Sequence, residues 1–298
     1  MRCLDLSFYT PDVCLVRVFA KRAILELMPT HDQVNWSTLK LTKQQKQKAM
    51  ARQSGLIKLK GTLDNVNFYK TKDGNLARMK TSVDAKRIAN DPAFERTREN
   101  GKEFGSSAAS GKLLRDAVRP MSMNASDGRV TARMTKVMTV IKNLDAVNDR
   151  GKRVVSQGIQ DPEGVAALKG FDFNKEALLG SILYKPFTVD PASGEIVIPN
   201  LVPQMDISWP QGATHIQLSC GFVGVDFDTN EKDLQISQMV NLPIDPTATT
   251  VTLTPAGAPA VATTKLFLLK IEFFQEVNGN QYTLKNGAYN ALKVVEVA

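Results

Sequence analysis

The sequence predicts an α+β fold, with a small β-meander and a helical hairpin in front of an antiparallel, immunoglobulin-like β-sandwich. Three observations predict it. Residues 56–80 alternate apolar and polar side chains over short runs, residues 91–144 carry apolar side chains at helical spacing, and several short apolar runs joined by Pro- and Gly-bearing turns follow residue 183. We therefore expect a leader or flexible arm at 1–49, a basic region at 50–155 and an acidic sandwich domain at 156–298.

The charge of the chain changes sign along its length. The 298 residues carry a net charge of +8, but residues 50–155 hold 22 basic and 11 acidic side chains, whereas residues 156–298 hold 8 and 15. A hydrophobic fraction of 43% and a charged fraction of 23% are typical of a folded globular protein. The asymmetry permits a polyanionic partner, head-to-tail assembly of identical chains, or solvated faces alone.

Residues 1–49 differ from the remainder of the chain. Their apolar side chains keep no sustained period, and they end on the polar run Lys43-Gln-Gln-Lys-Gln-Lys48. Because Met50-Ala-Arg-Gln-Ser-Gly is a plausible protein start, we expect either a leader upstream of the true initiation site or a mobile arm.

The front region begins with three expected strands, Leu56–Lys60, Val66–Thr71 and Leu76–Lys80, with Asp73-Gly74 as the hairpin turn before the last. Basic side chains alternate on all three strands and stand beside Phe68 and Tyr69. They either contact phosphates while the aromatic rings stack on bases, or form the solvent face of a small sheet. The candidate contact residues are Lys58, Lys60, Lys70, Lys72, Arg78 and Lys80.

A long helix is expected from Asp91-Pro92, an N-cap followed by a proline at the first helical position, to Pro120. Its glycines at Gly101 and Gly105, with Ala108 and Gly111 beyond them, form a smooth ridge, which predicts close packing against another helix. The expected partner spans Ser126–Leu144, with an apolar stripe at helical spacing. The stripe is typical of a core face, not of a cofactor site.

The back region is expected to be a sandwich. Its predicted strands are joined by turns such as Asp190-Pro-Ala-Ser-Gly194. The run Leu266–Phe274 is too apolar for an exposed strand and is predicted to be central. The other predicted strands are 187–189, 195–198, 215–222, 233–240, 249–253 and 290–297.

No catalytic, metal or cofactor site is predicted. The run Gly105 to Leu113 fails the phosphate-binding pattern, because five residues separate its glycines and leucine replaces the required hydroxyl. His215 lies five positions from Cys220, on the opposite face of a regular strand. A calcium loop at Asp226 to Glu231 would have glutamate where glycine is required, so an acidic turn is the favoured interpretation.

Cysteine count and hydropathy exclude other classes of protein. The chain has three cysteines, Cys3, Cys14 and Cys220, an odd number with no C-x-x-C pair among them. This excludes a disulfide scaffold and a zinc knuckle. No run of eighteen apolar residues and no signal-peptide pattern occurs, so we expect no membrane span and, by default, a cytoplasmic location.

Three segments resemble a family of Bacteroidota proteins to which no activity is assigned. They are Met50 to Gly61 with Asn67-Phe-Tyr-Lys, Arg87 to Asn100, and Phe274 to Gly279 with Leu284 to Leu292. The resemblance covers about residues 50–298 and implies no cofactor, catalytic residue or substrate.

These observations favour a non-enzymatic structural or interaction protein that associates with itself or another protein, of the kind found in virion or surface assemblies. The alternative is a nucleic-acid-binding protein that uses its basic N-terminal half. No small-molecule substrate is identified.

Overall fold

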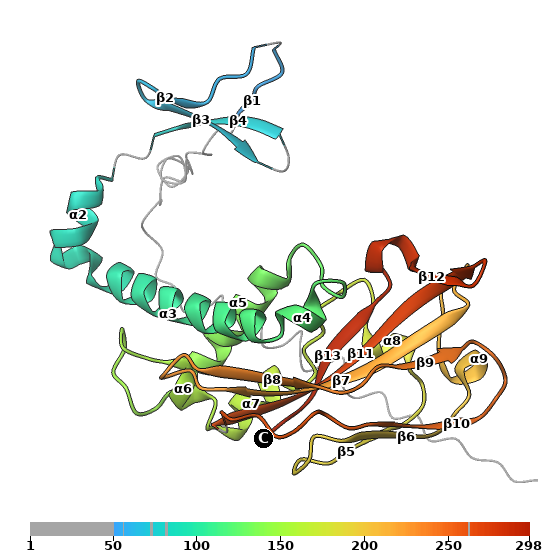
Figure 1. The fold of residues 1–298 in the computed structure, drawn as a ribbon. Helices are drawn as coiled ribbons and strands as arrows, with labels where there is room; N and C mark the ends of the chain where they lie inside the picture. Colours follow the sequence, from blue (N-terminus) through green and yellow to red (C-terminus); the bar gives the residue numbers. More distant parts are fainter. Residues whose placement is uncertain (1–50, 56, 72–73, 81–82, 262) are drawn as a thin grey trace, which may run out of the picture. The chain divides into compact units, whose positions relative to one another are not determined.

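The computed structural model describes residues 51–55, 57–71, 74–80, 83–261 and 263–298 (Figure 1). Helices and antiparallel sheets are both present, as predicted. The chain divides into two compact units, Met1–Ser82 (unit 1) and Val83–Ala298 (unit 2). This division lies well before the sign change of the charge near residue 155. The predicted leader or arm, 1–49, lies outside the described residues.

Unit 1 contains a four-stranded antiparallel sheet in the order β1-β4-β3-β2. Asp64, with φ of 47°, makes the tight turn between β2 and β3, a conformation that aspartate tolerates better than most residues. The strand expected at 66–71 is confirmed as β3, whereas the segment expected as a strand at 56–60 is not strand at its described positions, because pairing begins only at Gly61. The strands are β1 (Ala51–Arg52), β2 (Gly61–Leu63), β3 (Val66–Thr71) and β4 (Gly74–Met79).

The helices of unit 2 include the predicted hairpin. The Asp91 carboxylate accepts a hydrogen bond from the Ala93 N–H at 2.9 Å and caps η1 (Pro92–Phe94), which leads into α3 (Glu95–Ala117). Its partner is α5 (Val130–Asn143), and the other helices are short. They are α2 (Ala85–Asn90), α4 (Arg119–Ser122), α6 (Val155–Gly158), α7 (Pro162–Leu168), α8 (Leu179–Ile182) and α9 (Pro203–Asp206).

The strands of unit 2 form two antiparallel sheets. In the six-stranded sheet, β11 (Thr264–Val277) pairs with β7 (His215–Val225) along one edge and with β12 (Asn280–Thr283) and β13 (Ala291–Val297) along the other. The prediction that this apolar run is central is therefore confirmed. On its far side β7 pairs with β8 (Lys232–Ile236) and β9 (Val240–Pro243). The second sheet has three strands in the order β10-β6-β5. They are β5 (Thr188–Val189), β6 (Ile196–Leu201) and β10 (Thr249–Leu253).

The six-stranded sheet is curled and covered on both faces. Alternation along β11 sends Leu266 and Leu268 toward the helices, and Leu269 and Ile271 toward the three-stranded sheet. The curl brings β9 and β12 together although β7 and β11 separate them in the sheet, since Asn241 Nδ2 donates to Gln281 Oε1 at 2.5 Å. Unit 2 thus has a helix-side core and a sheet-side core.

In the described part of the chain, no helix is both long enough and apolar enough to cross a membrane.

Candidate interaction surfaces

An exposed apolar groove follows the crease between α3 and α5. Its volume is about 790 Å³, and two large side chains in it remain exposed, Phe104 at 59% and Val140 at 45%. Isolated exposed apolar residues are ordinary, but a continuous apolar groove of this size is typical of a contact surface. It is lined by Phe104, Ala108, Gly128, Arg129, Thr131, Ala132, Thr135, Lys136, Thr139 and Val140.

The threonines explain why a groove rich in hydroxyl residues is apolar. Thr135 Oγ1 donates to the Thr131 carbonyl at 2.9 Å, and Thr139 Oγ1 donates to the Thr135 carbonyl at 2.8 Å. These hydroxyls are satisfied by their own helix. What the two residues can still offer a partner is their methyl groups.

A buried ion pair fixes the two helices that form the groove. Lys142 on α5 donates to Glu103 on α3, and their side chains are only 7% and 5% exposed. The second carboxylate oxygen of Glu103 accepts from the Gly151 N–H at 2.6 Å. Burial acts to raise the pKa of Glu103, but the hydrogen bonds from Lys142 and Gly151 outweigh it and hold that pKa below its ordinary value.

The described residues make no close contact at Gly101 or Gly105, where a contact with the next helix was predicted. Both glycines are exposed, and a Cβ added at either would meet no described atom within 4 Å. The close approach to α5 occurs further along the helix, at Gly111, where an added Cβ would lie 3.3 Å from Met134 Cγ. The side chains of Met134 and Met138, and not a helix backbone, cover that glycine.

Replacing Gly101 or Gly105 with alanine is therefore expected to stabilise the protein. Each position lies inside α3 with open space beside it, so alanine should add about 1 kcal/mol to the free energy of unfolding. Urea denaturation of each variant measures this change. A loss of stability in the isolated monomer would mean that another part of the chain packs against the ridge.

The predicted basic residues of unit 1 do not share one surface. Cross-strand pairing places Arg78 opposite Asn67 and Tyr69 opposite Leu76, so Tyr69 and Arg78 lie on one face of the sheet. Lys70 lies on the other face with Phe68. We call the first the guanidinium face, comprising Arg52, Asn67, Tyr69, Leu76 and Arg78, and the second the apolar face, comprising Leu63, Val66, Phe68, Ala77 and Met79.

The remaining candidate lysines lie outside the strands. Lys58 donates to the backbone carbonyls of Gln53, at 2.8 Å, and Gly55, which holds its ammonium group against the loop. Lys60 and Lys80 are exposed at the ends of β2 and β4. Lys72 lies outside the described residues.

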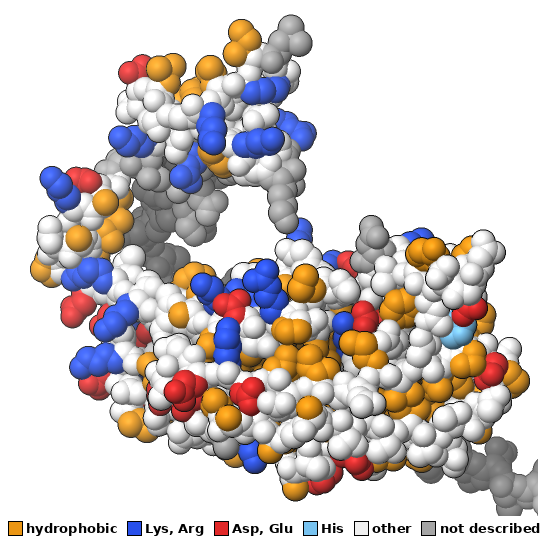
Figure 2. Space-filling model, in the orientation of Figure 1, with side chains coloured by type: hydrophobic (Ala, Val, Ile, Leu, Met, Phe, Trp, Pro, Cys, Tyr) orange, Lys and Arg blue, Asp and Glu red, His pale blue; other side chains and the backbone are white. Residues whose placement is uncertain are grey.

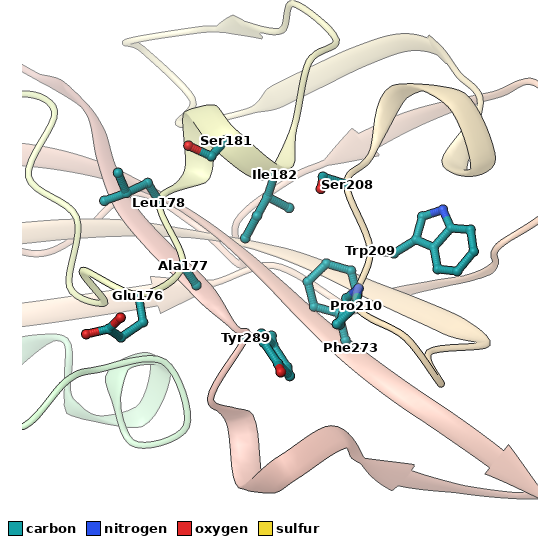
Figure 3. Close-up of a pocket in the computed structure, with 10 residues that line it drawn as sticks. All are labelled: Glu176, Ala177, Leu178, Ser181, Ile182, Ser208, Trp209, Pro210, Phe273 and Tyr289. Carbon is teal, nitrogen blue, oxygen red and sulfur yellow. The ribbon is translucent and has the colours of Figure 1, made fainter.

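Figure 3 shows a pocket in unit 2, where the α8 segment, the 208–210 loop, Phe273 of β11 and Tyr289 converge. Its volume is about 280 Å³, and Ala177, Ile182 and Phe273 at its base are buried. A backbone hydrogen bond of 2.8 Å from Ser208 to Ile182 ties the loop to α8. The pocket is therefore built on secondary structure and large enough for one aromatic or branched side chain.

Exposed apolar side chains surround this pocket. Trp209 and Leu178, which line it, are 42% and 43% exposed. Tyr184 and Met205, which lie close in sequence to the lining residues Ile182 and Ser208, are 64% and 78% exposed. Tyr184 is held beside α9 by a 2.9 Å backbone hydrogen bond to Asp206. We call these four residues, together with the pocket, the pocket surface. In the sequence they are isolated apolar residues, and no pattern predicted that they share a surface.

His215 lies between a hydroxyl group and a carboxylate, and not beside Cys220. Its Nδ1 lies 3.0 Å from Thr214 Oγ1 and its Nε2 lies 3.5 Å from Glu276 Oε2, at the exposed end of the curled sheet. Sequence reasoning missed a buried pair nearby on the helix-facing side of β11, Lys270 and Glu272, whose charged atoms are 3.1 Å apart. Packing against the helices, which no local pattern reveals, encloses that pair.

The acidic turn at 226–231 uses its carboxylate internally. Asp226 accepts hydrogen bonds from the backbone N–H groups of Asp228 and Thr229 and from the hydroxyl of Thr263, at 2.7, 3.0 and 2.8 Å. The hydrogen bonds from Thr229 and Asp228 lower the pKa of Asp226. Within the described ranges, no cluster of three His, Cys, Asp or Glu side chains could hold a metal ion.

Comparisons of the chain with protein families, with curated proteins and with solved structures found no match.

Proposed function

We propose that this protein is a non-enzymatic structural protein that assembles head to tail, the α3–α5 groove of one copy contacting the pocket surface of the next. The observation that carries the proposal is the basic-rimmed apolar groove with the exposed Phe104 ring. Antiparallel sheets in an immunoglobulin-like arrangement would form the rigid frame between the two surfaces. The packing of β6 and β10 against β7 and β11 supports that part of the proposal.

Charge favours unlike surfaces in this contact. Two grooves facing each other would bring Arg129 and Lys136 of both copies together, and like charges repel. The front region is basic and the back region acidic, so front-to-back contact is favoured over long range.

The pocket surface suits the exposed ring. Among the described residues, Phe104 is the only phenylalanine that is exposed. The pocket has apolar walls, with Glu176 at its edge. An aromatic anchor in a desolvated pocket is the usual energetic centre of a protein interface. Because each such contact leaves one groove and one pocket free, the assembly is open-ended unless it closes into a ring.

Sedimentation over a concentration series tests the proposal. The native chain is expected to grow beyond a dimer as concentration rises, and Phe104→Asp is expected to remain monomeric. Val147→Asp is the matched control, since Val147 is an exposed apolar residue of the same unit, outside both surfaces. A native chain that stays monomeric at every concentration and salt tested would overturn self-assembly.

Mixing two blocked variants tests the head-to-tail geometry. Phe104→Asp blocks the groove and Trp209→Asp blocks the pocket, so each alone is expected to be monomeric while their mixture gives a 1:1 dimer that grows no further. If Trp209→Asp assembles like the native chain, the pocket surface is not the partner of the groove. Growth beyond a dimer would then use a different partner surface, whereas growth that stops at a dimer would indicate a groove-to-groove contact.

A further inference from the structure

We infer that the guanidinium face of unit 1 binds single-stranded nucleic acid, with a base stacked on Tyr69 and Arg78 and the backbone held by the surrounding cations. This inference is independent of self-assembly. It rests on how the strand register sorts the side chains of a small sheet into two chemically different faces.

The geometry on this face combines charge with an aromatic plane. The Arg78 guanidinium lies over the Tyr69 ring, 5.4 Å from its centroid. Arg52 and Asn67 belong to the same face by their pairing with Leu76 and Arg78. Guanidinium and aromatic planes are the groups on which unpaired bases stack, and asparagine can both donate to and accept from base edges.

The charge around the face suits a polyanion. The described residues of unit 1 include six lysines and arginines but a single acidic residue, Asp64. Lys60 and Lys80 are exposed at the ends of β2 and β4, the two strands that flank β3. Phosphate contacts by such residues give affinity without sequence preference.

A single strand is favoured over a duplex and over a phosphate polymer. In a duplex the base faces are stacked inside the helix and cannot reach Tyr69, and a phosphate polymer has no base to stack. The aromatic plane therefore discriminates between these ligands, whereas the lysines do not.

The apolar face supplies matched controls for each contact. Lys70 and Phe68 are the neighbours of Tyr69 along β3, but they lie on the opposite face. Tyr69→Leu removes an aromatic ring from the guanidinium face, and Phe68→Leu, as a separate variant, removes one from the apolar face. In the same way, Arg78→Gln removes one positive charge from the guanidinium face, and Lys70→Gln removes one from the apolar face.

The experiment measures fluorescence anisotropy of a labelled oligothymidylate across a salt series, using the full chain that carries Phe104→Asp so that assembly does not add avidity. Affinity is expected to fall steeply with salt. Tyr69→Leu should weaken binding about tenfold, the effect of losing one stacked base, and Tyr69→Phe should retain it. Phe68→Leu should leave affinity unchanged.

Three results would overturn the inference. They are equal losses from Tyr69→Leu and Phe68→Leu, equal losses from Arg78→Gln and Lys70→Gln, and competition by inorganic polyphosphate as effective, per phosphate, as that by oligothymidylate. Each would reduce the interaction to general attraction between a basic chain and a polyanion. Retention of binding by Tyr69→Phe shows that the ring, and not the hydroxyl, is required, and Phe68→Leu shows whether the loss of a ring elsewhere in β3 impairs binding.

Discussion

Replacing Glu103 with glutamine is expected to lower the free energy of unfolding by about 3 kcal/mol, because it leaves the buried Lys142 ammonium without its carboxylate. Glutamine can still accept one hydrogen bond, but it carries no charge to offset the desolvation of the lysine. Urea denaturation at neutral pH measures the loss.

Two controls separate the buried charge from other effects of the substitution. The pair Arg150 and Glu99 joins α3 to the segment that follows α5 at 3.4 Å and is 48% and 28% exposed, so Glu99→Gln should cost less than about 1 kcal/mol. Glu103→Met combined with Lys142→Met should recover part of the stability lost in Glu103→Gln, since apolar residues can replace a buried pair but leave the Gly151 N–H without its acceptor. A double variant as unstable as the single one would show that the unpaired lysine charge is not the main cost of Glu103→Gln.

The pH dependence of this effect has a definite sign. The pKa of Glu103 is lower in the folded protein than its ordinary value, so its stabilising contribution is fully present above about pH 4.3, the ordinary value for glutamate. The contribution is lost as pH falls through the folded pKa. The difference in stability between the native protein and Glu103→Gln should therefore shrink below pH 4, whereas a difference independent of pH would contradict the assignment.

Local sequence patterns predicted the elements that are long and strongly periodic. The Asp91-Pro92 signal marked the start of the long helix because capping depends only on adjacent residues. The continuous apolar run in β11 marked a central strand because both of its faces are buried, one under the helices and one under the second sheet. These features are fixed by residues close together in the chain.

Features that depend on tertiary packing were not predictable in the same way. Helical spacing identified a ridge of glycines, but only the packed structure shows that Gly111 faces α5 while Gly101 and Gly105 do not. Alternation grouped Lys70 with Arg78 as basic strand residues, although the register of β3 with β4 places them on opposite faces. The pocket surface brings together segments about a hundred residues apart, from Glu176 to Tyr289.

The charge pattern placed a boundary near residue 155, and the position of the helix-side core makes that boundary testable. This core combines Leu114 and Met138 from the front region with Val223, Leu266 and Val294 from the back region. Charge is carried at the surface, so a change in its sign does not mark where one core ends and another begins.

A chain that begins at residue 156 is expected not to fold cooperatively, whereas one that begins at Val83 is expected to unfold in a single transition. Removal of α3 and α5 would uncover Leu266, Leu268 and Val294, and the three-stranded sheet covers only the opposite face. Burial of one large apolar side chain contributes about 1.5–3 kcal/mol to the free energy of unfolding. Exposure of a whole face of the central sheet removes several such contributions, and the total stability of a domain is only about 5–15 kcal/mol. Circular dichroism of the two chains during thermal unfolding measures the difference.

The chain from Val83 is the necessary control, because it keeps both cores while it omits unit 1. If the shorter chain fails and the longer one succeeds, helices and sheets form one cooperative unit. If both unfold cooperatively at the same midpoint, the α3–α5 hairpin is an attachment that contributes nothing to the sandwich. In that case the boundary lies near residue 155, as the charge predicts, and the buried faces of Leu266 and Val294 must be stable without the helices.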